Sequence, residues 1–384
     1  DWNINRNICI YHNIKKFKLK NNILEKFRSY TKKNYKSLRS SVFLSIHGKL
    51  IISKKTTNTK FKLLKNFSLK DFYKYKYRFF EMENGKIFTD NIENVSIIKD
   101  DKLLDNFSYQ QIKGKLVSSK NNQVIRTGTP RFLKKLKGSI AILSQGASGY
   151  SNYAHFILDI VPKIKLLSLG TKLKNIDYFY FSKPNKYQAE IFKIIGINKN
   201  RIVDSNKLRF VQYDKVFGVT HPYYFRGTFF KSQSKIPEWI IFYLREKFMK
   251  KFSLKYKFEK IFIDRSDSNF NHCRLINNEE IKNFLKTKNF RVIKLSNFNF
   301  KEQINIFNKA KVIIGPHGAG FVNLVFCKKK TKIIEIKPVN HTNELYKKIS
   351  KINGLSYKSI KLKKIKNNKK GDIFLKKEIL KKYI

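Results

Sequence analysis

Strands and helices alternate through the last third of the chain, and this order is the strongest constraint on its fold. The predicted elements, in chain order, are a strand at 259–263, a helix at 278–287, a strand at 291–295, a helix at 301–309, a strand at 311–314, a helix at 320–326, a strand at 331–336, a helix at 343–352, a strand at 357–362 and a basic helix at 372–383. Because the strands are hydrophobic throughout, we expect a parallel sheet that helices cover on both faces. The fold class is therefore α/β.

The middle of the chain repeats this alternation. A helix is expected at 152–167, a strand at 176–181, a helix at 187–195 that ends at Gly196, and one or two strands at 209–219. The turn residues at 220–234 are interpreted as an interdomain crossing, after which Pro237 opens a helix. The sequence thus predicts an N-terminal domain, 1–235, and a C-terminal domain, 236–384.

The N-terminal domain is expected to begin with a β-rich lead-in that extends to about residue 135. Short apolar runs such as 95–98 and 139–143 are typical of strands. Within the first 80 residues, the sequence predicts a basic helix at 22–35 and a strand at 41–47.

A glycine-rich turn, Gly315-Pro316-His317-Gly318-Ala319-Gly320, joins the predicted strand at 311–314 to the predicted helix at 320–326. Glycines let the backbone approach a ligand, and unpaired N–H groups together with the helix dipole favour phosphate. No Gly-Lys-Ser/Thr follows, and the spacing is not GxGxxG, which excludes a P-loop and argues against a Rossmann oxidoreductase. The turn predicts an anion site, and a tight turn around a buried histidine is the alternative.

Further motifs accompany this turn in order along the chain. They are Asn152-Tyr153-Ala154-His155-Phe156-Ile157-Leu158-Asp159, then Ile261-Phe262-Ile263-Asp264-Arg265-Ser266 followed by Arg274, then Asn277-Asn278-Glu279-Glu280-Ile281, and finally Ile333-Ile334-Glu335-Ile336-Lys337-Pro338. Over roughly residues 140–340, the set resembles glycosyltransferase family 61, once labelled capsular polysaccharide biosynthesis proteins. The chain departs from the family pattern at one Asn, either Asn277 or Asn278, which is extra or replaces the first Glu of the pattern. This leaves open whether Glu279 or Glu280 takes the family position.

The resemblance implies a GT-B-like architecture, with two Rossmann-like domains that face a cleft. It also implies an inverting, metal-independent hexosyl- or pentosyltransferase that uses no cofactor and takes a nucleotide-diphosphate sugar as its donor substrate. The implied acceptor is a bacterial capsule, lipopolysaccharide or other cell-surface glycan, or a lipid-linked precursor, at the cytosolic face of the membrane. A catalytically idle glycan- or nucleotide-binding relative is the alternative, because the Asn277-Asn278 segment is altered.

The candidate donor site combines cations, a turn and one acid. Its residues are Arg265, Arg274, Gly315, His317, Gly318, Ala319, Gly320 and Glu335. Arginine forks suit phosphate oxygens, and the turn supplies N–H groups. Glu335 is the only acid on an apolar strand, so it is expected to accept from ribose hydroxyls or to pair with a basic residue such as Arg265.

The candidate catalytic residues are His155 and Asp159, which lie four residues apart and so share one helix face. An imidazole and a carboxylate at a cleft suit removal of a proton from the acceptor hydroxyl. Which of the two is the base stays open, and a packed histidine with a structural aspartate is the alternative. The loop at 145–150 leads into them from a strand end.

The composition carries a formal net charge of +56, from 83 Lys and Arg against 27 Asp and Glu. This charge favours a nucleic-acid-binding protein as a rival function, but the lysines are spread evenly, as a codon bias would spread them. We therefore expect no nucleic-acid partner, and the lysine-rich stretch 361–383 favours an anionic membrane surface instead. The 3 cysteines lack zinc spacing, no apolar window reaches the ~18 residues that span a bilayer, and a cytoplasmic, peripheral location is expected.

Overall fold

The computed structural model describes residues 2–65, 67, 75–89, 94–112, 115–144, 151–223, 232–249, 256–268, 273–365 and 371–384. Side chains are described for all of these residues except those in 2–23 and 112–116. These residues form two compact units, each of which is described by itself. One comprises residues 1–51 and 123–132, and the other comprises 52–122 and 133–384.

The first unit is built on a long helix, α1 (Trp2–His47), with the short helix α3 (Val124–Thr127) beside its C-terminal end. The basic helix predicted at 22–35 is confirmed as part of α1, but the strand predicted at 41–47 is wrong. In a run this short, apolar residues alone do not separate a strand from a helix. Phe43 packs against Gly128, where an added Cβ would lie 2.4 Å from its ring, so the helical conformation gives this apolar side chain a partner.

The first sheet of the second unit is mixed. Its strands are β1 (Ile51–Ser53), β2 (Thr59–Leu63), β3 (Arg78–Glu83), β4 (Lys86–Phe88), β5 (Ser96–Lys99), β6 (Lys102–Leu104), β9 (Lys134–Ile142), β10 (Tyr178–Phe181), β11 (Ile202–Asp204) and β12 (Phe210–Val219). The main order is β1-β6-β5-β4-β12-β9-β10-β11, and β3 joins β12 and β2. Strand β9 pairs in parallel with β10 and with β12, and β10 pairs in parallel with β11. Strands β3 and β4 are antiparallel to β12. A separate hairpin pairs β7 (Gln110–Ile112) with β8 (Lys115–Val117).

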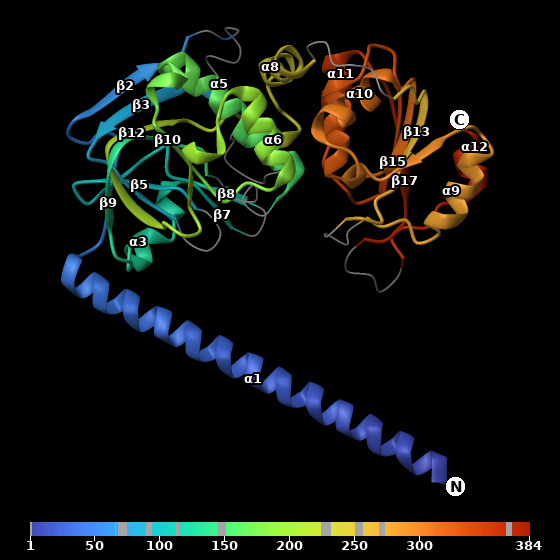
Figure 1. Ribbon diagram of the computed structural model, residues 1–384, viewed down its shortest axis with the longest axis horizontal. Helices are drawn as coiled ribbons and strands as arrows, with labels where there is room; N and C mark the ends of the chain where they lie inside the picture. The colour runs from blue at the N-terminus through green and yellow to red at the C-terminus, as the bar shows by residue number, and fades with distance from the viewer. Residues whose placement is uncertain are drawn as a thin grey trace. The chain divides into compact units, whose positions relative to one another are not determined.

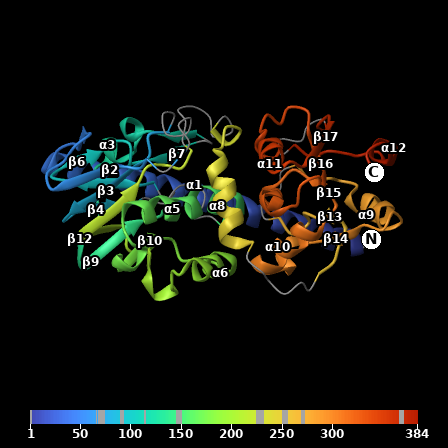
Figure 2. The ribbon, with the colours of Figure 1, turned by 90° about the horizontal axis from the view of Figure 1, so that it is seen from above.

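Helices cover one face of this sheet. A continuous helical segment runs through α4 (Tyr153–His155), a π-helical stretch at Phe156–Ile160 and α5 (Val161–Gly170), and α6 (Lys186–Ile195) follows β10. Figures 1 and 2 show α5 and α6 beside β10. The ring of Phe192 on α6 lies 5.5 Å from that of Phe181 on β10. The helices predicted at 152–167 and 187–195 are thus confirmed, the second ending at Gly196 in the left-handed conformation.

The second sheet is parallel throughout, in the order β14-β13-β15-β16-β17. Its strands are β13 (Lys260–Ile263), β14 (Arg291–Ile293), β15 (Val312–Pro316), β16 (Lys332–Pro338) and β17 (Ser356–Leu362). The helices are α8 (Glu238–Phe248), α9 (Asn278–Lys286), α10 (Phe300–Lys309), the 3₁₀ helix η7 (Ala319–Phe326), α11 (Leu345–Asn353) and α12 (Lys377–Lys381).

Both faces of this sheet are buried, as the apolar strands predict. Figure 1 shows α10 and α11 on one face and α9 and α12 on the other. Along β13, Ile261 and Ile263 belong to the core on the first face and Phe262 to the core on the second. The α/β class is therefore confirmed. The helix predicted at 372–383 is shorter than expected, because Ile373 pairs in extended form with Leu275 and Lys364.

Candidate functional site

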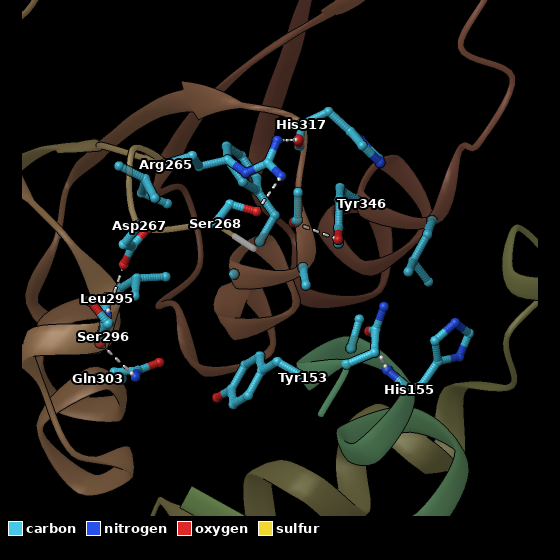
Figure 3. A pocket seen from close by; sticks show the side chains of 18 of the residues that line it. Tyr153, His155, Arg265, Asp267, Ser268, Leu295, Ser296, Gln303, His317 and Tyr346 are labelled. Carbon is cyan, nitrogen blue, oxygen red and sulfur yellow. Dashed lines mark hydrogen bonds between the residues drawn. The ribbon is translucent and has the colours of Figure 1, made fainter. Parts of the chain in front are cut away.

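A cavity of about 400 Å³ is lined by residues from the strands, helices and loops around both sheets. Its lining comprises Ser151, Asn152, Tyr153, Ala154, His155, Tyr187, Gln233, Ile263, Asp264, Arg265, Asp267, Ser268, Leu295, Ser296, Gln303, His317, Gly318, Ala319, Gly320, Phe321, Asn343, Leu345 and Tyr346. Figure 3 shows Arg265, His317 and Tyr346 on one side and Tyr153 and His155 on the other. Six of the ten predicted site residues line this cavity: His155, Arg265, His317, Gly318, Ala319 and Gly320.

The glycine turn follows β15 at the carboxyl end of the parallel sheet, where ligands bind in such folds. Gly318 has φ 177° and ψ 170°, an extended conformation that any residue adopts. Its need for glycine is one of space, because an added Cβ would lie 2.3 Å from Nε of Arg265. At Gly320, an added Cβ would lie 2.4 Å from Cδ1 of Leu295. The glycines therefore let neighbouring side chains cross the turn.

The helix after the turn is confirmed in place but is the 3₁₀ helix η7, so its dipole is weaker support for an anion than an α-helix would give. The turn still presents backbone donors. Within the described part of the chain, no hydrogen bond occupies the N–H groups of Gly318, Ala319 and Gly320. All three residues line the cavity, and N–H groups of successive residues in a turn are a common way to bind an anion.

Arg265 follows β13 and lies across the turn. Its guanidinium donates to the carbonyl oxygen of His317 and, at 3.4 Å, to Oγ of Ser268. Burial lowers the pKa of Arg265, but an arginine pKa begins so high that the group stays charged at neutral pH. The structure thus places one cation against the glycine turn.

His317 is buried and is held by a carboxylate on the neighbouring strand. Its Nδ1 hydrogen-bonds Oε1 of Glu335, and Oε2 of Glu335 accepts from the hydroxyl of Tyr357. The Nζ of Lys337 lies 3.7 Å from the same carboxylate. Burial alone would raise the pKa of Glu335, but the bond to His317 and the charges of His317 and Lys337 lower it below its ordinary value. Glu335 lies outside the cavity lining, and its carboxylate holds the imidazole of His317 by this bond.

His155 is held in a similar way on the opposite side. Its Nδ1 lies 2.9 Å from Oδ2 of Asp159, and Oδ1 of Asp159 accepts from the hydroxyl of Tyr223. Asp159 lies in the π-helical stretch and is buried, whereas the side chain of His155 is 12% exposed and lines the cavity. Asn152 accepts from the backbone N–H of His155 and fixes the start of the helix. The structure therefore brings the two predicted catalytic residues together, with the imidazole toward the ligand space.

Two further titratable groups lie near Asp159. Burial lowers the pKa of Lys163 to about 7, although the charge of Asp159 raises it. Burial also lowers the pKa of His221 to about 3, so His221 is neutral at neutral pH. Its Nδ1 accepts from the backbone N–H of Tyr223, at 3.1 Å.

Arg274 is not brought to the cavity. Its guanidinium pairs with Asp372 at 2.9 Å, and its side chain is 56% exposed. Gly315 lies inside β15, where an added Cβ would lie 3.0 Å from Cβ of Ile263, and it also lies outside the cavity lining. The loop at 145–150 and the greater part of the predicted crossing, 224–231, lie outside the described residues.

Several cavity residues were not among the sequence candidates. The hydroxyl of Tyr153 donates to Asn323 at 2.6 Å, and Asn323 donates to Gln303 at 2.9 Å. Gln303 in turn donates to the carbonyl oxygens of Leu295 and Phe298. In the sequence, the sign of these hydrogen bonds is Asn323, a polar residue that interrupts an otherwise apolar helix. Its partners are far away in the sequence and leave no pattern.

Asp264 is buried and its carboxylate already has partners. Burial by itself would raise the pKa of Asp264, but hydrogen bonds from the N–H of Ser266, from Asn278 and from Lys282 lower it. In the described ranges, no three His, Cys, Asp or Glu side chains gather as metal ligands. Metal-independent catalysis stays a prediction.

Comparison with known proteins identifies the family. Residues 153–334 match the family model described as Glycosyltransferase 61, and this range includes the cavity residues His155, Arg265 and His317. The resemblance to glycosyltransferase family 61 that the motifs predicted is confirmed over this part of the chain. The family indicates a glycosyltransferase. No curated protein matches the chain. Among the helices of the described residues, none combines the length and the apolar character that a membrane span requires.

Proposed function

We propose that the protein is an inverting glycosyltransferase of GT-B type that transfers a hexosyl or pentosyl group from a nucleotide-diphosphate sugar. The observation that supports this most directly is the make-up of the cavity. One side carries Arg265 and the N–H groups of the glycine turn, and the other carries His155 with Asp159 behind it. A leaving diphosphate and an attacking hydroxyl need these two kinds of group at the two ends of one reaction.

The donor binds with its diphosphate at Arg265 and the turn from Gly318 to Gly320. Charged hydrogen bonds from a guanidinium and from backbone donors stabilise phosphate oxygens and do so more strongly as charge builds up on the leaving group. His317, which Glu335 holds in place, lies beside this position and steadies the turn or donates to a phosphate oxygen.

The acceptor hydroxyl lies at His155. Its oxygen attacks the anomeric carbon while Nε2 of the imidazole takes the hydroxyl proton. The new carbon–oxygen bond forms as the bond to the diphosphate breaks, and the nucleoside diphosphate leaves with the bonding electron pair. Asp159 stabilises the imidazolium that forms, as a carboxylate behind a histidine base does. A single displacement of this kind inverts the anomeric configuration.

The acceptor that we propose is a growing cell-surface glycan or a lipid-linked precursor, such as those of capsule or lipopolysaccharide, at the cytosolic face of a bacterial membrane. This part rests on the family. Metal independence is supported by Asp264, whose carboxylate oxygens are taken up by Ser266, Asn278 and Lys282. The positive groups at the turn then supply the charge that a metal ion supplies elsewhere.

Two substitutions test the division of roles. His155→Asn should lower transfer at least about a hundredfold, the size of a general-base contribution, and leave the affinity for the nucleoside diphosphate unchanged. Arg265→Ala should instead weaken nucleotide binding, measured by calorimetry. Arg274→Ala is the matched arginine control, since its side chain lies outside the cavity, and it should retain affinity. Full transfer by the His155 variant would remove the imidazole as the base.

A further inference from the structure

A row of seven positions, six of them with large apolar side chains, runs along the exposed surface of α1. Its positions are Leu24, Phe27, Thr31, Tyr35, Leu38, Val42 and Ile46, and they are called here the 24–46 stripe. Successive positions are separated by three, four and four residues, and this order then repeats. An 11-residue repeat has 3.67 residues per turn, close to the 3.6 of a straight helix. The stripe therefore stays on one face over the whole distance.

The apolar members of the stripe are exposed. The fractions run from 47% at Leu24 to 70% at Ile46. The contact with α3 uses another part of the helix surface, since Phe43 meets Gly128 while Val42 and Ile46 stay exposed. Six large apolar side chains aligned on one exposed face are more than scattered surface residues, and such a face marks an interaction site.

The charge of this segment selects the partner. Between residues 24 and 47 there are six basic residues, Lys26, Arg28, Lys32, Lys33, Lys36 and Arg39, and one acid, Glu25. A second copy of α1 laid against the stripe would bring like charges together, which is unfavourable. An anionic surface would instead attract the same side chains. Arg28 and Arg39 each follow a stripe position by four residues, so they lie along the edge of the stripe.

We propose that residues 24–46 of α1 bind an anionic lipid surface, with the helix lying in the plane of the membrane. Apolar side chains on one face of such a helix enter the boundary between headgroups and acyl chains, and Lys and Arg reach the lipid phosphates. No helix of the described residues is able to span a bilayer, so this contact is peripheral for that part of the chain. The proposal does not depend on the transfer chemistry, because vesicle binding is measured without donor or acceptor.

The test is co-sedimentation of the full chain with vesicles of phosphatidylcholine, with and without phosphatidylglycerol. The wild-type protein should bind the anionic vesicles and release them at high salt. The variant Phe27→Gln/Leu38→Gln/Val42→Gln should bind at least about tenfold more weakly. The matched control Ser29→Gln/Ser37→Gln/Ser41→Gln places the same residues at exposed positions of the same helix outside the stripe and should bind as the wild type does. Replacing Arg28, Lys32 and Lys36 by Gln should lower affinity about fivefold per residue.

Circular dichroism checks that each variant keeps its helix content. Equal binding of the stripe variant and its serine control would overturn the proposal, as would equal binding to neutral vesicles at high salt. Sedimentation velocity tests whether a second copy of the chain binds the 24–46 stripe. A dimer that the stripe variant loses, in a protein that does not bind anionic vesicles, would assign the stripe to self-association and also overturn the membrane proposal.

Discussion

At the scale of single residues, Gly318 controls the position of Arg265. Gly318→Ala would place Cβ 2.3 Å from Nε of the arginine, so the guanidinium must move away from the turn. If Arg265 contacts the diphosphate, its loss costs about 1.5–3 kcal/mol, or roughly ten- to a hundredfold in affinity. We therefore expect Gly318→Ala to weaken nucleotide binding within that range.

A double-mutant cycle checks this cause. Since the alanine acts through the arginine, the variant Arg265→Ala/Gly318→Ala should bind nucleotide no more weakly than Arg265→Ala alone. Additive losses, measured by calorimetry, would contradict this account and would indicate that the new methyl group blocks the donor itself.

Because Lys163 is buried, the stability of the folded protein should depend on pH. Its folded pKa of about 7 lies below the unfolded value near 10.4, because burial disfavours the charged form. Between these pH values the unfolded chain binds more protons than the folded one, so the free energy of unfolding rises with pH there. Below pH 7, the buried charge of Lys163 destabilises the folded state by its full amount. Lys163→Met should therefore raise the Tm by a few degrees at pH 6, and the gain should shrink as pH rises toward 10. The exposed control Lys174→Met should show no such trend. A Tm gain that is constant with pH would exclude this explanation.

The sequence predicted correctly which residues lie together where the pattern is local. His155 and Asp159 are four apart on a helix, and the glycine turn is contiguous, so spacing alone brought each set together. Tyr223 and Tyr357 complete the two histidine–carboxylate pairs from distant segments, and hydrogen bonds of that kind follow from tertiary packing. Arg274 was predicted as a second phosphate-binding arginine because its guanidinium suits phosphate oxygens, but in the structure it pairs with Asp372.

At the scale of elements, α10 is capped from a helix of the other sheet. Glu190 on α6 accepts from the backbone N–H of Phe300 at 2.9 Å and of Lys301 at 3.3 Å, while Asn299 caps the next donor. Caps of this kind contribute about 0.5–2 kcal/mol. Glu190→Ala should lower the free energy of unfolding by about that amount, whereas the exposed Glu246→Ala should change it little. Equal denaturant midpoints for these two variants would show that the cap has no net effect.

The parallel sheet was predicted from sequence because each of its strands and helices carries its own hydrophobic period. Positions 259–263 and 311–314 correspond closely to β13 and β15. The segment 41–47 was assigned to a strand because its local composition resembles one, and its helical state depends on continuation from the residues before it. Propensity is a weak guide when neighbouring structure decides the conformation.

At the scale of the whole molecule, the cavity draws on elements of both sheets, from Tyr153 on α4 to Tyr346 on α11. A ligand that binds only the folded state stabilises it by about 2.7 kcal/mol at a hundred times its Kd. A donor in this cavity should therefore raise the Tm of the second unit as a whole. In the proposed site, one arginine and three backbone N–H groups make the diphosphate contact, so the proposal does not require the net charge of +56.

The final prediction concerns the donor and the metal together. A panel of UDP-, GDP-, CMP- and dTDP-linked sugars, read by thermal shift, should contain one donor class that raises the Tm of the wild-type protein. Because the charge at the turn comes from Arg265 and backbone N–H groups, the shift should be the same with EDTA and with manganese. Arg265→Ala should lose most of the shift, and Arg274→Ala should keep it. A shift that disappears with EDTA and returns with manganese would assign the diphosphate contact to a cation, with Asp264 or Asp267 as its first candidate ligands, and the donor site proposed at the turn would then be wrong.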